Sequence, residues 1–242
     1  MPSPDLTQNA VLMERLAQIE AGPSGAQIGA FFDFDGTLID GFSAMYLVKE
    51  RWKNKQIGLR EASELLTFGL NKHPSDTDFF ELISNAAERW KGLGEDAVAK
   101  LWEKIFVRHI AQTVFPEAWR LVQAHQRKNH TVAIASSATR WQILPAAREF
   151  GIAHVLATPV QVRDGKLTGR LDGAPLWNEG KARAVKAFAK SQGLKLDQSY
   201  GYANGDEDVA FLASGGHPLA VNAKPELVRA AAHSACVELV IA

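Results

Sequence analysis

The stretch FFDFDGTLID, from Phe31 to Asp40, is the most informative segment of the chain. It continues the apolar run IGAFFDF, which is typical of a short strand buried on both faces of a parallel sheet. Two acids, Asp33 and Asp35, stand within this apolar surrounding. Residues two apart in an extended segment point to the same face, so both carboxylates are expected to face one site.

Two carboxylates in one pocket repel each other and need a cation to compensate them. Mg2+ prefers carboxylate and carbonyl oxygens, which Asp33 and Asp35 supply. An aspartate can also attack phosphorus and form an acyl-phosphate. Gly36 and Thr37 fit a tight turn that offers backbone N–H groups to a phosphate. The alternative is that the acids only cap a turn or helix, and spacing alone does not choose between the two.

Strand-like and helical segments alternate over most of the chain, which predicts an α/β fold with a doubly wound, Rossmann-like parallel sheet. TVAIASSA (131–138) is a second buried strand with small polar residues at its end. Asp164-Gly165 marks the turn of a hairpin. Between residues 42 and 113 only helical spacing occurs, which predicts an inserted all-helical cap domain. The predicted core comprises residues 1–41 and 114–242, with 1–27 as an N-terminal helical extension.

Composition narrows the function classes. The 242 residues carry 27 basic and 27 acidic side chains, so net charge gives no electrostatic case for a nucleic-acid partner. The single cysteine, Cys236, excludes an internal disulfide. We find no secretory signal and no apolar run long enough for membrane insertion. These features predict a cytoplasmic protein, whose N-terminal helix either packs on the core or mediates a homodimer.

Polar clusters follow the predicted strands, at the end where ligands bind in open α/β sheets. They are DFDGT after the first strand, SSAT after the second and NGDED after a later one. Lys181 opens a helix after WNEG. If the strands are parallel neighbours, all four features meet in one crevice.

These clusters resemble, in order, the motifs of the haloacid dehalogenase (HAD) superfamily of phosphohydrolases. DFDGT resembles the first motif, Ser136 the second, Lys181 the third and the acidic loop 202–208 the fourth. The helical insert resembles the cap of subclass IB, which contains phosphoserine phosphatase. Several segments are also similar to the HAD domain of bifunctional HAD/1-acylglycerol-3-phosphate acyltransferases. The acyltransferase-like spacing in HPSDTD, from His73 to Asp78, is better explained as a loop and helix cap at Ser75 or Asp76.

The resemblance implies a Mg2+-dependent phosphomonoester hydrolase that acts on a small-molecule phosphate ester. Asp33 would form an aspartyl-phosphate, Asp35 would serve first as acid and then as base, and Lys181 would neutralise charge. The residues implied in binding phosphate are Thr37, Ser136, Ser137 and Lys181, and those implied in binding the metal are Asp33, Asp35, Asn204 and Asp208.

The fourth motif departs from the family pattern at Asn204, where an aspartate is usual. An amide oxygen can still bind Mg2+, but without charge, so metal affinity should fall unless Asp206 takes over. This leaves open a catalytically weak or inactive binding or regulatory module. A phosphotransferase, which passes phosphate to an alcohol other than water, is a further alternative.

The substrate is the least constrained feature. Phosphoserine phosphatases usually have a glutamate for the amino group where this chain has Phe42, which disfavours phosphoserine. Phe42, Met45, Tyr46 and Trp52 either form an apolar wall near the cap entrance or belong to the core. An apolar wall would favour glycerol phosphates or lysophospholipids.

Overall fold

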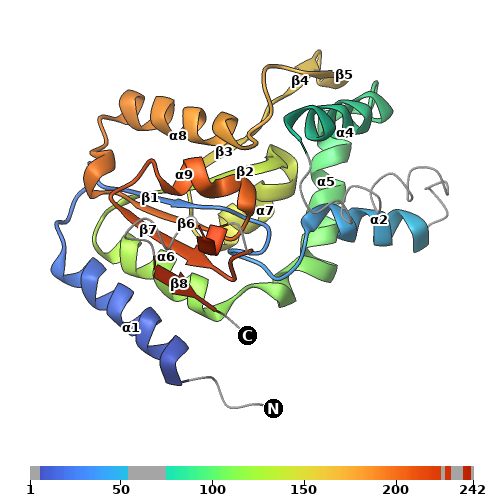
Figure 1. The fold of residues 1–242 in the computed structure, drawn as a ribbon. Coiled ribbons are helices and arrows are strands. Elements are labelled where there is room, and N and C mark those ends of the chain that lie inside the picture. Colours follow the sequence, from blue (N-terminus) through green and yellow to red (C-terminus); the bar gives the residue numbers. More distant parts are fainter. Residues whose placement is uncertain (1–5, 54–74, 225–226, 230–236, 241–242) are drawn as a thin grey trace.

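The computed structural model describes residues 6–53, 75–224, 227–229 and 237–240, and shows the predicted α/β fold (Figure 1). Six parallel strands form one sheet in the order β3-β2-β1-β6-β7-β8. The strands are β1 (Gly29–Phe32), β2 (Thr131–Thr139), β3 (His154–Thr158), β6 (Tyr200–Ala203), β7 (His217–Val221) and β8 (Val237–Leu239). β1 therefore lies between β2 and β6, and the polar clusters that follow these strands lie at one edge of the sheet.

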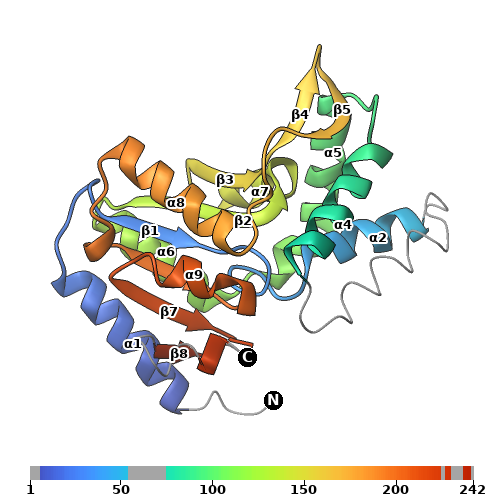
Figure 2. The same cartoon turned by 45° about the horizontal axis from the view of Figure 1, so that its top comes forward.

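Helices cover both faces of this sheet (Figures 1 and 2). Phe32 points to one face, packed with α1 (Leu6–Ala21), α6 (Pro116–Arg127) and α7 (Arg140–Glu149). Phe31 points to the opposite face, packed with α8 (Glu179–Gln192) and α9 (Val209–Leu212). Since neighbouring residues of a strand face opposite ways, burial on both faces explains why β1 is continuously apolar.

The N-terminal helix α1 packs on the core. The Arg15 guanidinium is buried and donates hydrogen bonds to the carbonyls of His217 and Pro218, at 2.9 and 2.7 Å. Lys128 Nζ donates to the Glu20 carbonyl at 2.8 Å. The first of the two roles predicted for this helix is thus the one that the structure shows, and a homodimer stays a prediction.

A buried chain of side chains ties the segment after α1 to α6 and β6. His130 Nε2 lies 2.9 Å from the Pro23 carbonyl, and His130 Nδ1 lies 2.8 Å from His125 Nδ1. His125 Nε2 lies 2.7 Å from the Tyr202 hydroxyl. Burial lowers the pKa of both histidines, which favours neutral rings. Because a carbonyl only accepts, a neutral His130 donates through Nε2 and accepts through Nδ1; His125 then donates through Nδ1, and Tyr202 donates to His125.

Helices α2 (Ser43–Lys53), α4 (Asp76–Arg89) and α5 (Glu95–Ile105) come between β1 and β2 and lie beside the sheet (Figure 2); we call them the inserted helices. A π-helical turn (Phe106–Ile110) and a 3-10 turn (Ala111–Thr113) lead back to the core. The helical segment predicted around 60–70, and His73, lie outside the described residues. Ser75 caps α4 in a reciprocal capping box with Asp78, which confirms the predicted helix cap.

The predicted hairpin comprises β4 (Val160–Arg163) and β5 (Lys166–Leu171), and it docks on the connection between α4 and α5. The Leu167 N–H donates to the Leu93 carbonyl at 2.9 Å, and the Gly92 N–H donates to the Leu167 carbonyl at 2.8 Å. Gly169 has φ +82°, and a Cβ on it would lie 2.7 Å from Glu88 Oε2. The hairpin thereby joins the inserted helices to the core through backbone contacts.

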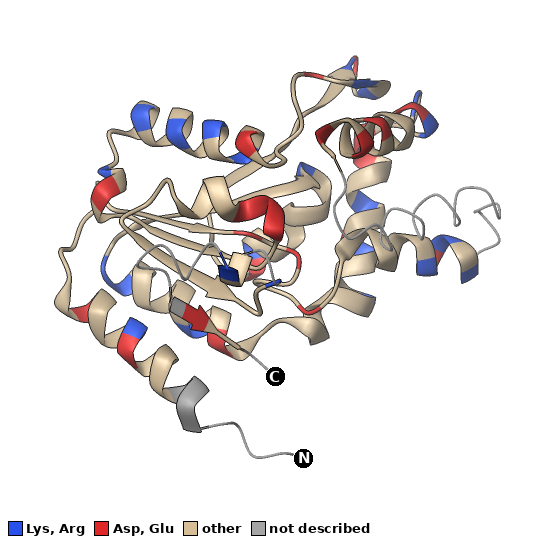
Figure 3. Ribbon diagram, viewed as in Figure 1, with Lys and Arg blue, Asp and Glu red and all other residues tan. Residues whose placement is uncertain are grey.

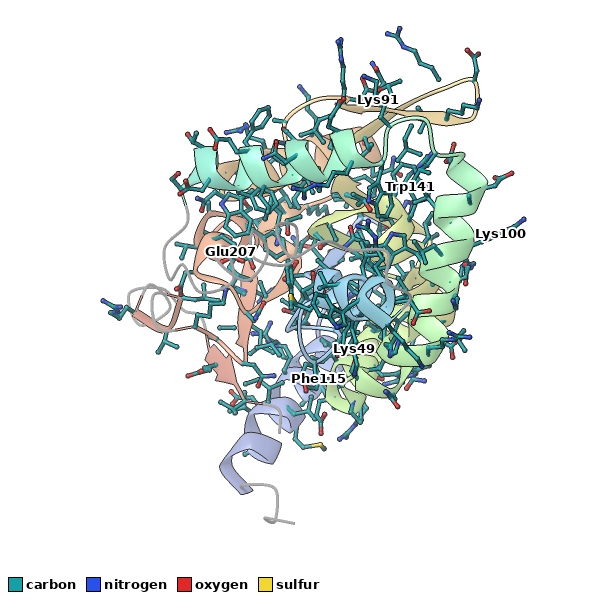
Figure 4. All side chains as sticks on the ribbon, turned by 90° about the vertical axis from the view of Figure 1, so that its right-hand side faces the viewer. Lys49, Lys91, Lys100, Phe115, Trp141 and Glu207 are labelled. Atoms are coloured by element: carbon teal, nitrogen blue, oxygen red, sulfur yellow. The ribbon has the colours of Figure 1, made fainter. Side chains whose placement is uncertain are left out.

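A second junction connects α5 with α7. The Trp141 indole N–H donates to Glu95 Oε1 at 3.4 Å, and Arg140 forms an ion pair with the same carboxylate. Figure 4 shows this side of the molecule, with Trp141 labelled beside α5. Within the described residues, no helix is long and apolar enough to cross a bilayer.

Candidate active site

The central feature of the site is a lysine held between two carboxylates. Lys181 Nζ donates to Asp33 Oδ1 at 2.9 Å and to Asp208 Oδ1 at 2.5 Å. Their side chains are nearly inaccessible, at 2% exposure for Lys181, 8% for Asp33 and 0% for Asp208. Water therefore screens these charges little.

Each member of this triad comes from the end of a different element. β1 ends at Phe32, and the Asp33 N–H donates to the Tyr202 carbonyl at 2.8 Å, which fixes Asp33 at the edge of the sheet. Lys181 lies in the first turn of α8. Asp208 follows β6, and its second oxygen accepts a 3.3 Å hydrogen bond from the Gly205 N–H. In Figure 3 the acidic turn 206–208 lies close to the strand ends.

Burial and the neighbouring charges shift the pKa values of the triad in known directions. Burial raises the pKa of Asp33 to about 7, Lys181 opposes this rise, and the nearby Asp208 and Asp35 add to it. Burial opposes the charge on Lys181, but the carboxylates of Asp208 and Asp33 outweigh it and raise the lysine pKa. Lys181 is therefore a permanent cation at the site.

The Asp35 carboxylate is oriented by Ser43, the first residue of α2. The Ser43 N–H donates to Oδ1 at 2.7 Å, and the Ser43 hydroxyl donates to Oδ2 at 3.0 Å. Burial raises the pKa of Asp35 to about 6, while the hydrogen bonds from Ser43 act in the opposite direction. Gln142 Nε2 in turn donates to Ser43 Oγ at 3.2 Å.

Asn204 directly follows β6 and lies against the turn after β1. Gly36 has φ +75°, and a Cβ on it would collide with the Asn204 amide. Thr37 Oγ1 lies 3.5 Å from Asn204 Oδ1, which is a weak contact. Asn204 thus lies beside the DFDGT turn, as expected for a residue of the same site.

The remaining predicted residues are placed as follows. Ser136 is buried near the end of β2, the neighbour of β1, and its hydroxyl accepts the Ala138 N–H at 3.2 Å. The Ser137 carbonyl accepts from the Thr158 hydroxyl at 2.6 Å. Asp206 Oδ1 accepts the Leu227 N–H at 2.9 Å. Glu207, labelled in Figure 4, lies on the same turn, and burial raises its pKa.

The charges of the site suit a divalent cation. Asp33, Asp35 and Asp208 bring three carboxylates, against which Lys181 supplies one positive charge. Hard oxygen donors of this kind suit Mg2+. Among the described residues, no three His, Cys, Asp or Glu side chains form a chelating group, so a cation held here would also need backbone or amide oxygens.

Ser43 and Gln142 are the residues of the site that the sequence pattern did not reveal. Gln142 lies 99 residues from the serine that it contacts. Serine at a helix start and glutamine within a helix are common, so neither carries a recognisable pattern.

Comparison with known proteins agrees with this geometry. The family model of haloacid dehalogenase-like hydrolases matches residues 30–213, which include every site residue described above. A probable phosphatase of Mycobacterium tuberculosis is 28% identical over 201 residues, covering 81% of this chain and 69% of the relative. A phosphoserine phosphatase of the same organism is 27% identical over 231 residues, covering 91% and 75%. These names support the prediction of a phosphatase.

Solved structures share the fold. A protein of unknown function from Bordetella pertussis has a TM-score of 0.76 at 23% identity, covering 88% of this chain and 98% of its own. A phosphoserine phosphatase with a phospho-aspartyl intermediate analogue has a TM-score of 0.63 at 21% identity, covering 88% and 93%. With the family model matched over most of its length, the chain belongs to the haloacid dehalogenase-like hydrolase family.

Proposed function

We propose that this chain is a phosphatase that hydrolyses small phosphate monoesters through an aspartyl-phosphate on Asp33. The observation that carries the proposal is the buried contact of Lys181 with Asp33 and Asp208, with the Asp35 carboxylate close by. Lys181 holds Oδ1 of Asp33, and we assign the attack on phosphorus to the other oxygen. A bond forms between Asp33 and phosphorus as the bond to the leaving oxygen breaks.

Asp35 would move the proton in both half-reactions. It gives a proton to the leaving oxygen in the first, and it takes one from the water that attacks the aspartyl-phosphate in the second. A pKa of about 6 makes both protonation states accessible near neutral pH. Lys181 neutralises charge on Asp33 and on the phosphoryl oxygens. Thr37, Ser136 and Ser137 are the proposed phosphate-binding residues.

The proposed metal ligands are the Asp33 carboxylate, the Asp35 backbone carbonyl and the Asn204 amide oxygen. When bound, Mg2+ supplies positive charge that favours the ionised form of Asp33 and the developing phosphoryl charge. Asp208 was also predicted as a ligand. Both of its oxygens accept hydrogen bonds in this structure, so we assign it to holding Lys181 in place.

The inserted helices would act as a cap that selects the substrate. Phe42 is 39% exposed and Trp52, at the other end of α2, is 52% exposed. Tyr46 instead stacks on His109, with ring centroids 6.1 Å apart, and therefore serves packing. Phe42 offers no charge to an ammonium group, so we favour substrates without one, such as glycerol phosphates or lysophospholipids, over phosphoserine.

The test is hydrolysis of p-nitrophenyl phosphate with and without Mg2+, by the native chain and the variants Asp33→Asn and Asn204→Asp. We expect native activity that needs Mg2+ and disappears in Asp33→Asn. Products formed with added glycerol separate hydrolysis from phosphotransfer. A native chain that turns over no ester under these conditions would overturn the proposal.

Asn204 supports a second candidate, a binding module that keeps the fold but not turnover, because it supplies no charge to the metal. Activity that appears only in Asn204→Asp would select this candidate.

A further inference from the structure

The orientation of Asp35 depends on a relay of hydrogen bonds that crosses from the core to the inserted helices. Both Asp35 oxygens accept hydrogen bonds from Ser43, and Ser43 Oγ accepts one from Gln142. Ser43 belongs to α2 and Gln142 to α7. The two are almost inaccessible to water, at 0% and 8% exposure, so water does not compete for these bonds.

The relay has one direction. Gln142 Oε1 accepts from both the N–H and the hydroxyl of Thr139, each at 2.8 Å, because these residues form the capping box of α7. This fixes the amide so that its NH2 group faces Ser43. Ser43 Oγ then accepts from Gln142, and its own proton is directed at Asp35.

We propose that Ser43 and Gln142 are positioning residues, which hold the Asp35 carboxylate so that it can protonate the leaving oxygen. The inference rests on the proposed function, and it extends it to two residues that touch neither phosphorus nor metal. The hydroxyl bond fixes one oxygen and the backbone N–H the other, which defines the plane of the carboxylate. Asp35 is only partly buried as a residue.

The relay also makes the orientation of Asp35 depend on where the inserted helices lie. Ser43 is the first residue of α2, so a movement of α2 away from α7 breaks the hydrogen bond from Gln142 to Ser43. The same movement displaces the two groups of Ser43 that donate to Asp35. The carboxylate is then held for proton transfer only in the arrangement described here.

Leaving-group dependence distinguishes positioning from a structural role. An alkyl phosphate needs a proton on its leaving oxygen, whereas p-nitrophenolate leaves readily without one. We expect Ser43→Ala to lower kcat/KM for glycerol phosphate by about 10- to 100-fold, part of the usual effect of a general acid. Its effect on p-nitrophenyl phosphate should stay within about 3-fold, since general-acid help matters little there.

Gln142→Glu is the matched variant. It keeps the side-chain oxygen that caps α7 but removes the NH2 donor, so the Ser43 hydroxyl turns to the new carboxylate and away from Asp35. We expect Gln142→Glu to show the same selective loss of kcat/KM for glycerol phosphate. The double variant Ser43→Ala/Gln142→Glu should lose no more than either single variant. Ser43→Thr keeps the hydroxyl and should retain the native activity on glycerol phosphate.

Asp35→Asn separates the two proposals. If it shows the selective loss and Ser43→Ala does not, the positioning role is wrong while the proposed function stands. If Ser43→Ala lowers kcat/KM equally for both esters, the positioning role is likewise contradicted. Unfolding curves of each variant show whether a loss of activity comes from a loss of folded protein. If Asp35→Asn lowers kcat/KM, which reports only the steps up to the aspartyl-phosphate, equally for both esters, or if the native chain hydrolyses neither, the proposed function fails and the positioning role with it.

Discussion

Replacing Lys181 by methionine tests the electrostatics of the triad most severely. Methionine keeps the length of the aliphatic stem but removes the amine, whose Nζ lies 5.7 Å from the centre of the Phe211 ring. Two buried carboxylates, those of Asp33 and Asp208, then lose the amine 2.9 and 2.5 Å away. Their desolvation cost remains while the compensating attraction is gone.

Breaking a buried ion pair by removing one partner typically costs about 3–5 kcal/mol of unfolding free energy. We expect a loss in this range at pH 8. Without Lys181, which opposes the rise, the folded-state pKa of Asp33 lies further above its unfolded value. The folded variant then binds more protons than the unfolded chain, so its deficit against the native protein shrinks as the pH falls towards 5.

The assay is urea unfolding followed by tryptophan fluorescence. Lys186→Met, on the exposed side of the same helix, is the matched control and should change stability by less than about 0.5 kcal/mol. Adding Asp208→Asn to Lys181→Met removes one orphaned charge and should recover part of the loss. A loss no larger than that of Lys186→Met, or no recovery in the double variant, would show that Lys181 does not compensate the two carboxylates.

Three further predictions follow from other parts of the structure. Asn204→Asp should tighten Mg2+ binding by roughly tenfold, because a charged ligand replaces a neutral one; calorimetric titration without substrate that shows unchanged affinity would contradict this. Burial lowers the folded-state pKa of His125, so at this site the unfolded chain binds more protons, and His125 by itself should lower stability by about 1.4 kcal/mol per pH unit below about pH 6.5. Asp33 and Asp35, whose pKa values are raised, act in the opposite direction, so the contribution of His125 is measured as the difference between the native chain and His125→Asn. Urea unfolding of His125→Asn at several pH values should show that its unfolding free energy falls less steeply with decreasing pH than that of the native chain. Equal pH dependence in the two proteins would argue against a neutral His125 ring. Gly165 has φ +69° and no atom near the position of an added Cβ, so Gly165→Ala should lower the unfolding free energy by about 1 kcal/mol. Gly169→Ala should lower it clearly more, because its Cβ would also meet Glu88. Equal melting temperatures of the two variants would show that the close approach of Gly169 to Glu88 contributes nothing.

The features that could be predicted from sequence are those with a local pattern. The apolar run that ends just before Asp33 predicted a buried strand of the sheet. Lys181 at a helix start and the acidic turn after β6 come from separate segments, and the parallel order of strands brings them together. The turn at Asp164-Gly165 was likewise readable, because both residues have positive φ, as a tight hairpin turn requires.

The features that could not be predicted depend on single contacts between distant residues. The bond from Gln142 to Ser43 and the pairing of Leu167 with the loop before α5 leave no periodic pattern. The pairing of His125 with Tyr202 joins residues 77 positions apart. Asp206 illustrates the converse: an aspartate at this position suits a metal ligand, but one of its oxygens accepts the Leu227 N–H, a contact that the sequence does not reveal.

The central claim is that Asp33 carries the phosphoryl group during turnover, and acid quenching tests it most directly. The native chain is mixed with Mg2+ and p-nitrophenyl phosphate, quenched in acid within the first turnovers, digested and analysed by mass spectrometry. We expect the peptide containing Asp33 to gain the mass of one phosphoryl group, and the corresponding peptide of Asp33→Asn to gain none. Turnover by the native chain with the phosphoryl group found on another residue, or undiminished turnover by Asp33→Asn, would contradict it.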